Sequence, residues 1–407
     1  MQDLTETLLF FFAFFAFDKK QGLLRHLGAR KGDPMKVMIF SVTAGQGHNT
    51  TARVLAEALA ARGHKTTVVD TFRATSRLLY LTYDKGYLLA ASRLGVFYGW
   101  GYYASENRKT NSYRTSLARI SYRGVAKKLS KMINEFDPDV IVTTHPIGSA
   151  IIDLTKERHG FRAKAVGIST DFTMHPYWED ALRFDRVVIA NEQLIPLAEK
   201  KGFPFEKILP TGIPINERFA EKIDKGEARR ALGIPEDLPV LLVMSGSMGH
   251  GNMKKTIKTL SVMPERFGII TVCGRNEKAY RAIERAHPDK LLMNFAFTDK
   301  VSLLMDAADA IVTKPGGLTT SEALAKELPL ILCDSIPGQE IRNEEFLLRM
   351  GAALPAKNPK ALSESVRLFL ESNEARESIK ASIRALKKPF ATQSLCQEIE
   401  NFHCQEN

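Results

Sequence analysis

Short runs of apolar, often β-branched residues alternate along the chain with longer stretches of helical periodicity. Such runs, apolar at every position, are typical of strands buried on both faces of a parallel sheet. In the first half of the chain we expect strands at 36–41, 66–70, 139–144, 164–169, 185–190 and 207–211. In the second half we expect them at 240–245, 268–273, 291–295, 310–313, 329–333 and 352–354.

Two successive series of strands and helices predict an α/β protein with two doubly wound, Rossmann-like domains. Prolines and glycines interrupt the pattern between the two series, which places the hinge near 204–216. The first series begins at Met35, directly before the first expected strand. The expected parts of the chain are a leader at 1–34, a first domain at 35–205, a second domain at 206–385 and a terminal helix at 386–407.

The leader contains a ten-residue apolar run, Leu8 to Phe17, which is too short to span a bilayer. Asp3 and Glu6 precede this run and no basic residue does, so the run does not have the pattern of a signal peptide. We therefore expect the leader to be disordered or to touch a membrane.

The overall composition is that of an ordinary globular protein, with 44% hydrophobic and 25% charged residues. This balance excludes disordered, collagen-like and multi-span membrane chains. The four cysteines show no Cys-x-x-Cys spacing, so the sequence predicts neither a zinc site nor a disulfide framework.

The chain is basic, with a formal charge of +11, and the surplus is concentrated in one stretch. Residues 73–131 contain twelve basic residues, two acidic residues and eight of the ten tyrosines. Aromatic rings interleaved with cations suit the surface of a membrane that contains anionic lipids. The alternative is a solvated helical face with buried tyrosines. No recognised nucleic-acid module surrounds the stretch, so we expect no nucleic acid as a partner.

Glycines and a histidine follow the first expected strand, in the segment Gly45-Gln-Gly47-His48. The glycines let a ligand approach the positive end of the next helix, which we expect at 52–62. With Asp70 at the end of the next strand, the segment resembles a dinucleotide-binding fingerprint, but Thr50 stands where its third small residue belongs. We interpret His48 as a general base with a near-neutral pKa; a residue that caps or orients the loop is the alternative.

Further polar residues follow two other strands of the first domain. His145 follows the strand at 139–144, and Asp171 and His175 follow the strand at 164–169. Because the carboxyl ends of parallel strands meet at one edge of the sheet, these side chains face the same cleft as His48. They could shape an acceptor pocket or coordinate a metal, and the lack of tight ligand spacing favours the pocket. Tyr102, from the basic stretch, is assigned to the same pocket.

Three polar segments in the second domain each follow a strand. The glycine turn at 246–251 and Lys314 suit a phosphate, and Gly316 and Gly317 admit a close approach. Glu322 either accepts hydrogen bonds from ribose hydroxyls or only favours a helix N-terminus. The segment after 329–333 suits the hydroxyls of a sugar ring. The candidate donor-binding residues are Ser245, Gly246, Gly249, His250, Arg275, Lys314, Gly316, Gly317, Thr319, Glu322, Gln339, Glu340 and Asn343.

Taken in order, these motifs over residues 36–360 resemble the monogalactosyldiacylglycerol synthase and processive diacylglycerol β-glucosyltransferase family. The resemblance implies a GT-B fold with an acceptor domain, a nucleotide-sugar domain and a cleft between them. It also implies inversion at the anomeric carbon, no catalytic metal or other cofactor, and peripheral binding to the inner leaflet. The motifs are Gly45-Gln-Gly47-His48, Thr144-His145-Pro146, Thr170-Asp171-Phe172, His175-Pro176, Thr211-Gly212-Ile213-Pro214, Lys314 to Glu322 and Pro337-Gly-Gln339-Glu340.

By position, the resemblance makes His48 the base or its partner, Glu322 the ribose ligand, and Gln339 and Glu340 the contacts of the donor sugar. Gln46 stands where the plant galactolipid enzymes of this family have a third glycine, which favours glucose over galactose and a bacterial enzyme. The resemblance therefore predicts transfer of a hexose from a UDP-sugar to diacylglycerol at the cytoplasmic face of the cell membrane, with residues 73–131 on anionic lipids.

Several alternatives remain. Two are related activities, an undecaprenyl-linked N-acetylglucosaminyltransferase and a UDP-N-acetylglucosamine epimerase, although an epimerase would have no use for the Tyr/Arg-rich stretch. The others are an NAD-dependent oxidoreductase, which would use Asp70 to bind ribose, and a non-catalytic sensor of UDP-sugar. The sequence predicts no particular oligomeric state.

Overall fold

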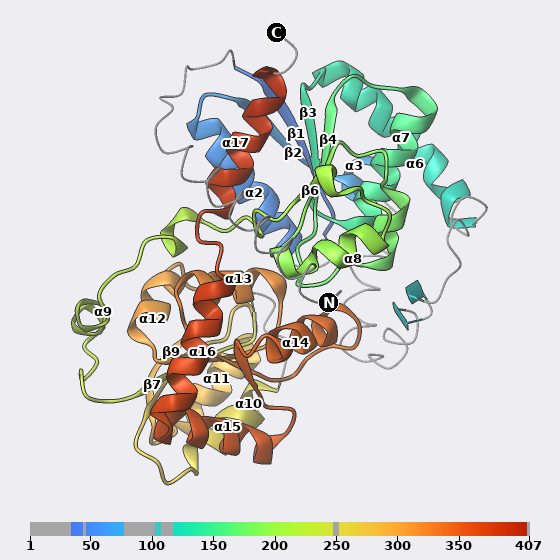
Figure 1. Cartoon of the computed structure of the whole chain (residues 1–407). Helices are drawn as coiled ribbons and strands as arrows, with labels where there is room; N and C mark the ends of the chain where they lie inside the picture. The colour runs from blue at the N-terminus through green and yellow to red at the C-terminus, as the bar shows by residue number, and fades with distance from the viewer. Residues whose placement is uncertain are drawn as a thin grey trace, which may run out of the picture.

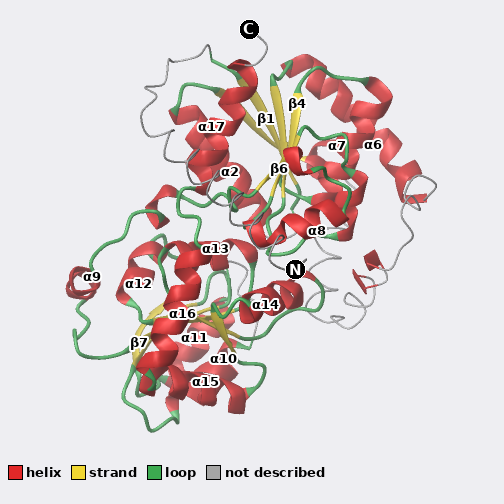
Figure 2. Ribbon diagram, in the orientation of Figure 1, coloured by secondary structure: helices red, strands yellow, loops and turns green. Residues whose placement is uncertain are grey.

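A computed structural model describes residues 34–43, 46–76, 102–103, 105–106, 117–246 and 252–404. These residues form two α/β domains, each built around a six-stranded sheet, and the domains lie one above the other in Figure 1. Figure 2 shows helices flanking the strands in both domains. The expected fold class, two doubly wound domains, is thereby confirmed. The expected leader lies outside the described residues except for Pro34.

The first sheet is entirely parallel and has the order β2-β1-β3-β4-β5-β6. Val37 and Ile39 of its central strand pack under one helical layer, and Met38 and Phe40 under the other, so both faces of the strand are buried. The strands are β1 (Lys36–Ser41), β2 (Lys65–Asp70), β3 (Val140–Thr143), β4 (Lys164–Ile168), β5 (Arg186–Val188) and β6 (Ile208–Leu209). The helices are α2 (Gln46–Ala61), α3 (Thr71–Thr75), α6 (Leu117–Phe136), α7 (Pro146–His159) and α8 (Ile195–Lys200).

The second sheet is also parallel and has the order β12-β11-β10-β7-β8-β9. Its strands are β7 (Val240–Met244), β8 (Gly268–Val272), β9 (Leu291–Phe295), β10 (Ala310–Thr313), β11 (Leu330–Leu332) and β12 (Ala353–Pro355). Its helices are α9 (Lys225–Leu232), α10 (Met253–Ser261), α11 (Glu277–Ala286), α12 (Val301–Ala307), α13 (Gly317–Ala325), α14 (Gln339–Arg349), α15 (Pro359–Glu371) and α16 (Asn373–Leu386).

All twelve expected strands exist, but the first helix begins earlier than expected. We expected it at 52–62, and the structure begins α2 at Gln46. Gly47 and His48 therefore lie in the first helical turn and not in the loop before it. The apolar stripe that predicts a helix starts only where burial starts, at Thr51 and Ala52, so the polar first turn gave no signal.

The terminal helix α17 (Ala391–Cys404) packs on the first domain, beside α2 in Figure 1. Leu395, Cys396, Ile399 and Phe402 join the apolar cluster beneath α2 and β1. We expected this helix at 386–407, but Pro389 separates it from α16, because proline lacks the N–H that a continuous helix needs.

The chain therefore crosses between the domains twice, and the two crossings touch. Gly212, on the first crossing, has φ +96°, a backbone conformation that favours glycine. A Cβ atom on Gly212 would lie 2.5 Å from the Cβ of Lys388, on the second crossing. Nearby, the Asn191 side chain donates a hydrogen bond to the Leu386 carbonyl at 3.2 Å.

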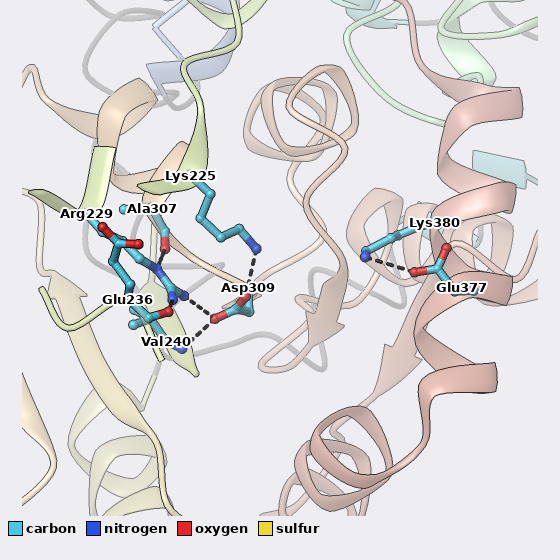
Figure 3. Close-up of polar contacts among 8 residues, drawn as sticks. All are labelled: Lys225, Arg229, Glu236, Val240, Ala307, Asp309, Glu377 and Lys380. Carbon is cyan, nitrogen blue, oxygen red and sulfur yellow. Dashed lines mark hydrogen bonds and ion pairs between the residues drawn. The ribbon is translucent and has the colours of Figure 1, made fainter. Parts of the chain in front are cut away.

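Asp309 fastens the amino-terminal end of the second sheet (Figure 3). Its Oδ2 accepts from the Val240 N–H at 2.7 Å and from Arg229 Nη2 at 2.6 Å, and its Oδ1 accepts from Lys225 Nζ at 2.7 Å. These bonds tie α9 to the starts of β7 and β10. Polar residues at this end of the sheet are therefore explained by stability, since ligands bind at the opposite, carboxyl edge.

The two domains meet where the carboxyl edges of both sheets face each other. A Cβ atom on Gly317, the first residue of α13, would lie 1.9 Å from the Thr170 carbonyl oxygen, so only glycine allows this approach. The Phe172 and Phe346 rings pack across the same contact with centroids 5.6 Å apart. We call this contact the domain seam.

Within the described residues, no helix has both the length and the apolar composition needed to cross a bilayer.

Gly317→Ala should weaken the domain seam, and the neighbouring Gly316→Ala provides a matched control, because a Cβ on Gly316 would have nothing within 4 Å. Overpacking of this kind costs about 1–3 kcal/mol. We expect Gly317→Ala to lower the free energy of unfolding by that amount and to speed amide hydrogen exchange at 170–173. Equal effects of the two substitutions would contradict this account of the seam.

Candidate active site

The predicted site residues gather at the points where the strand order of each sheet reverses. In the first sheet this point lies between β1 and β3, which His48 and His145 follow. In the second it lies between β7 and β10, which Ser245 and Lys314 follow. Ligands of open α/β sheets bind in the crevices at such points. The seam therefore brings together the candidate acceptor and donor residues.

His48 is held as a neutral imidazole with one nitrogen fixed as a donor. Its Nδ1 lies 2.6 Å from the Thr144 carbonyl oxygen and 2.9 Å from Thr170 Oγ1. Because a carbonyl oxygen can only accept, Nδ1 carries the proton and Nε2 presents a lone pair. The near-neutral pKa that we expected for His48 is wrong: burial lowers it from 6.5 to about 4, although the bond to Thr144 opposes the shift. A neutral ring with an accepting Nε2 is the form that a general base requires.

His145 and His175 have the opposite tautomer. His145 caps α7 and His175 caps the short helical turn at Pro176–Asp180. In each ring Nδ1 accepts a backbone N–H, from Ile147 at 3.1 Å and from Tyr177 at 3.2 Å respectively. Their Nε2 atoms therefore carry the proton and can donate. Burial, followed by the nearby rings of His48 and His175, lowers the pKa of His145 well below 6.5. The pocket thus combines one accepting ring with two donating rings.

The acceptor residues predicted from sequence lie close together. The His48 and His145 ring centroids are 4.6 Å apart, and the Tyr102 and His175 centroids are 5.1 Å apart. Tyr102 is buried, which fits its predicted place in this pocket. Gly45 lies outside the described residues, and a Cβ on Gly47 would have nothing within 4 Å.

Asp171 and Asn343 meet across the seam. Asn343 is fully buried; its Nδ2 donates to Asp171 Oδ1 and to the Pro315 carbonyl, both at 2.9 Å, and its Oδ1 accepts the Phe172 N–H at 2.8 Å. The structure thus places Asn343 between the domains, and its amide is occupied by protein atoms. Contact between Asn343 and a sugar, which we predicted from sequence, remains untested.

Lys314 and Glu340, predicted to hold phosphate and sugar respectively, bind each other. Lys314 Nζ lies 2.9 Å from Glu340 Oε1, and Glu340 Oε2 accepts the Ile336 N–H at 2.9 Å. Both side chains are largely shielded from solvent. Gly316, where an added Cβ would have nothing within 4 Å, lies at the positive end of α13. A phosphate would find a cation and a helix N-terminus here.

Glu322 is half-buried on α13. Burial raises the pKa of its carboxyl group from 4.5 to about 8, although the Arg218 charge opposes the shift. Among the described residues, no hydrogen bond or ion pair reaches this carboxyl group. Glu322 therefore presents a polar group that a ligand can satisfy, and Thr319 lies half-buried one turn before it.

The remaining predicted donor residues that the structure describes lie at the same edge of the second sheet. Ser245, directly after β7, is buried, and its hydroxyl has no hydrogen-bond partner among the described residues. Gly246 has φ +71°, which starts a turn towards the segment 247–251. Gly249 and His250 fall in that segment, outside the described residues. Arg275 is exposed after β8, and Gln339 begins α14.

Asp70 has a structural role that leaves little room for the dinucleotide alternative. Its Oδ1 accepts the N–H groups of Phe72 at 3.1 Å and Arg73 at 2.9 Å, and its Oδ2 accepts from the backbone and hydroxyl of Thr43. Both oxygens thus cap α3 and brace the loop after β1. A ribose would have to displace these bonds.

The hydrogen bonds that orient His48 were not predicted from the sequence. Thr144 and Thr170 follow β3 and β4, and both stand in motifs that were noted for their neighbours His145 and Asp171. The signal was therefore available in the threonines themselves.

Within the described residues, no three His, Cys, Asp or Glu side chains converge in a group that could hold a metal ion.

Comparisons with known proteins agree with this arrangement. Residues 48–215 match the family model described as monogalactosyldiacylglycerol (MGDG) synthase, and residues 224–385 match the model described as glycosyl transferases group 1. A processive diacylglycerol beta-glucosyltransferase of Bacillus pumilus (strain SAFR-032) is 26% identical over 368 residues, covering 89% of this chain and 94% of that protein. One of Bacillus cereus (strain AH820) is 27% identical over 364 residues, covering 87% and 90%.

Solved structures share the fold at lower identity. Acinetobacter baumannii MurG aligns with a TM-score of 0.63 at 15% identity, covering 90% of this chain and 100% of MurG. The S. aureus MnaA-UDP co-structure aligns with a TM-score of 0.60 at 11% identity, covering 90% and 96%. These structures show that the fold is GT-B. The family models and the named relatives show that the chain is a glycosyltransferase, a hexosyltransferase. Within that class its first domain matches the monogalactosyldiacylglycerol synthase family, so the resemblance seen in the sequence is confirmed.

Asp171→Asn should stabilise the protein above pH 6. Burial, with the Glu340 charge as a smaller cause, raises the pKa of Asp171 from 3.8 to about 6. Stability from this group is thus complete below about pH 4 and is lost as the pH rises through 6, at a cost of at most about 3 kcal/mol. Asparagine removes the charge but keeps an oxygen for Asn343. Thermal unfolding from pH 4 to 8 should show a gain that grows with pH; a constant difference would refute the assignment.

Proposed function

We propose that the protein transfers a hexosyl unit, glucose in preference to galactose, from a UDP-sugar to diacylglycerol with inversion and without a catalytic metal or other cofactor. The observation that carries the proposal is His48, a neutral imidazole with an accepting Nε2 at the seam between the two domains. The names of the Bacillus relatives, which align over most of this chain, support diacylglycerol and glucose.

His48 Nε2 takes the proton of the acceptor hydroxyl as that oxygen attacks the anomeric carbon. The glycosidic bond forms while the bond to UDP breaks on the opposite face, and UDP leaves with the electron pair. The donating Nε2–H groups of His145 and His175 orient the acceptor oxygen. The Thr144 carbonyl stabilises the imidazolium that forms, because Nδ1–H already points at it.

The donor binds on the second domain. A diphosphate at the start of α13 attracts the Lys314 ammonium, which frees Glu340 to accept from sugar hydroxyls. Glu322, with its pKa raised to about 8, is a largely neutral acid near pH 7 and can both donate to and accept from ribose hydroxyls. Ser245 offers its buried hydroxyl at the same edge.

The acceptor is membrane-bound, and α6 offers a surface for a membrane. Arg123, Lys127 and Lys131, spaced four residues apart, lie exposed along one side of this helix. Val125 and Leu129 on the other side are buried. Tyr102 and Tyr122 are buried as well, so these two tyrosines follow the structural alternative. We infer peripheral binding to anionic lipid at the cytoplasmic face, carried by the cations of residues 73–131.

Labelled UDP-glucose and UDP-galactose, each offered with diacylglycerol liposomes, test the proposal through chromatography of the lipids. We expect label in glycosyldiacylglycerol, more from UDP-glucose than from UDP-galactose. His48→Ala should lower kcat by about a hundred- to ten-thousandfold, the usual contribution of a general base, with UDP affinity unchanged.

The exposed His159, at the end of α7, gives a matched control, since His159→Ala should keep full activity. Label in no lipid with either donor would end the proposal. A folded His48→Ala protein with near-wild-type turnover would remove only the assignment of the base.

Reversing the cationic stripe on α6, with Arg123, Lys127 and Lys131 all changed to Glu, should weaken binding to anionic liposomes by a hundredfold or more, since each cation near such a surface contributes about 1 kcal/mol. Liposome sedimentation measures this, and UDP affinity should not change. The control reverses three exposed cations on α11, Lys278, Arg281 and Arg285, at the far edge of the second domain. An equal loss in both triple variants would indicate a general charge effect.

A further inference from the structure

Arg342, on α14 of the second domain, is clasped by residues of the first domain. Its Nε and Nη2 donate to the two carboxylate oxygens of Glu106 at 3.1 and 2.7 Å. Its guanidinium also lies 5.4 Å from the centroid of the Tyr103 ring, and its Nη1 donates to Glu345 of the same helix at 2.9 Å. The pair with Glu106 joins the two domains at a point separate from the Asn343 contacts.

The same short segment contacts the acceptor pocket. Tyr102 packs its ring against His175, and the Tyr102 and Tyr103 rings meet edge to face with centroids 5.8 Å apart. Tyr102 is only 4% exposed, so it is fixed against the pocket. The residues of 102–106 that the structure describes therefore contact the pocket through one ring and α14 through the next ring and a carboxylate.

The contacts of Arg342 with Glu106 and Tyr103, which we call the clasp, lie next to the residues assigned to the donor sugar. Gln339 and Glu340 begin α14, and Arg342 stands within one helical turn of both. A helix moves as a rigid unit over such a distance, so a force on Arg342 acts on the start of α14. The Asn343 bonds to Asp171 and Phe172 hold the next residue of this turn.

This ion pair differs from ordinary surface pairs, which contribute little. Both oxygens of Glu106 are engaged, and the Arg342 and Glu106 side chains are only 35% and 28% exposed. Among the described residues Glu106 has no other cation, whereas Arg342 keeps Glu345 if the clasp opens. Glu106 therefore favours the arrangement in which α14 lies against the acceptor pocket.

We propose that Arg342 is a positioning residue that couples the acceptor pocket to the binding of the donor sugar. Clasped by Glu106 and Tyr103, it holds the start of α14, with Gln339 and Glu340, beside the pocket that His175 and Tyr102 line. Because coupling between two sites is reciprocal, acceptor binding tightens the hold on the hexose of the donor by the same factor. The inference rests on the proposed function for the identity of the two substrates.

The test is a double-mutant cycle with Arg342→Gln, Glu106→Gln and the double variant. In calorimetry without acceptor, each single variant should bind the UDP-hexose that the wild type prefers roughly five- to tenfold more weakly. Affinity for UDP should stay unchanged, because UDP lacks the sugar that α14 holds. The double variant should be no weaker than either single variant, since one change already breaks the pair.

Arg367→Gln is the matched control. Arg367 pairs with Glu265 at 2.7 Å on the outer face of the second domain, and its loss should change neither affinity. Additive effects in the double variant, equal losses for UDP and UDP-hexose, or no loss at all would each overturn the inference. If the wild type glycosylates no diacylglycerol, the proposed function fails, whereas the hold of Arg342 on the donor-binding end of α14 is still judged from the two affinities.

Discussion

The arrangement of the whole site depends on one buried amide between the domains. Asn343 leaves none of its hydrogen-bonding groups without a protein partner: it binds Asp171 and Phe172 of the first domain and Pro315 of the second. A buried amide whose partners move away costs free energy, so its partners hold the two sheets at a fixed separation. The glycine approach at Gly317, the base and the donor residues all depend on that separation.

On both sides of the seam, burial shifts the pKa values of titratable site residues, because a charged group is costly to bury. Burial raises the pKa of Glu322 to about 8 and lowers that of His48 and His145, so these three groups are neutral near pH 7, whereas Asp171, with its pKa raised only to about 6, ionises there at a cost. Neutral groups are cheaper to bury than charged ones, and their hydrogen-bonding direction is set by their tautomer or protonation. The site is thus a set of directed donors and acceptors, with Lys314 and Glu340 as its paired charges.

The fold could be predicted from the sequence because strands buried on both faces are apolar at consecutive positions, as in Val37 to Phe40 of β1 and throughout β7. The positions of His48 and Lys314 followed, since Lys314 stands directly after β10 and His48 in the first turn of the helix after β1. Glu322 lies in the second turn of α13, so it is not an acidic residue of the helix N-terminus. The partners of those residues could not be predicted. That Lys314 binds Glu340, or that Asn343 lies between domains, depends on how two separate sheets dock, which local patterns do not encode. The polar first turn of α2 was missed because exposed residues carry no periodicity.

The return of the chain to the first domain through α17 has a mechanical consequence. Two covalent connections, in contact at Gly212 and Lys388, join the domains on one side of the molecule. A single tether would allow the second domain to swivel, whereas two adjacent tethers define an axis and leave bending about it as the easy motion. His48 and Lys314 belong to different domains, so a change of angle at the tethers changes their separation. Opening the site to substrates and bringing His48 into line with the donor residues are therefore opposite directions of the same bending motion.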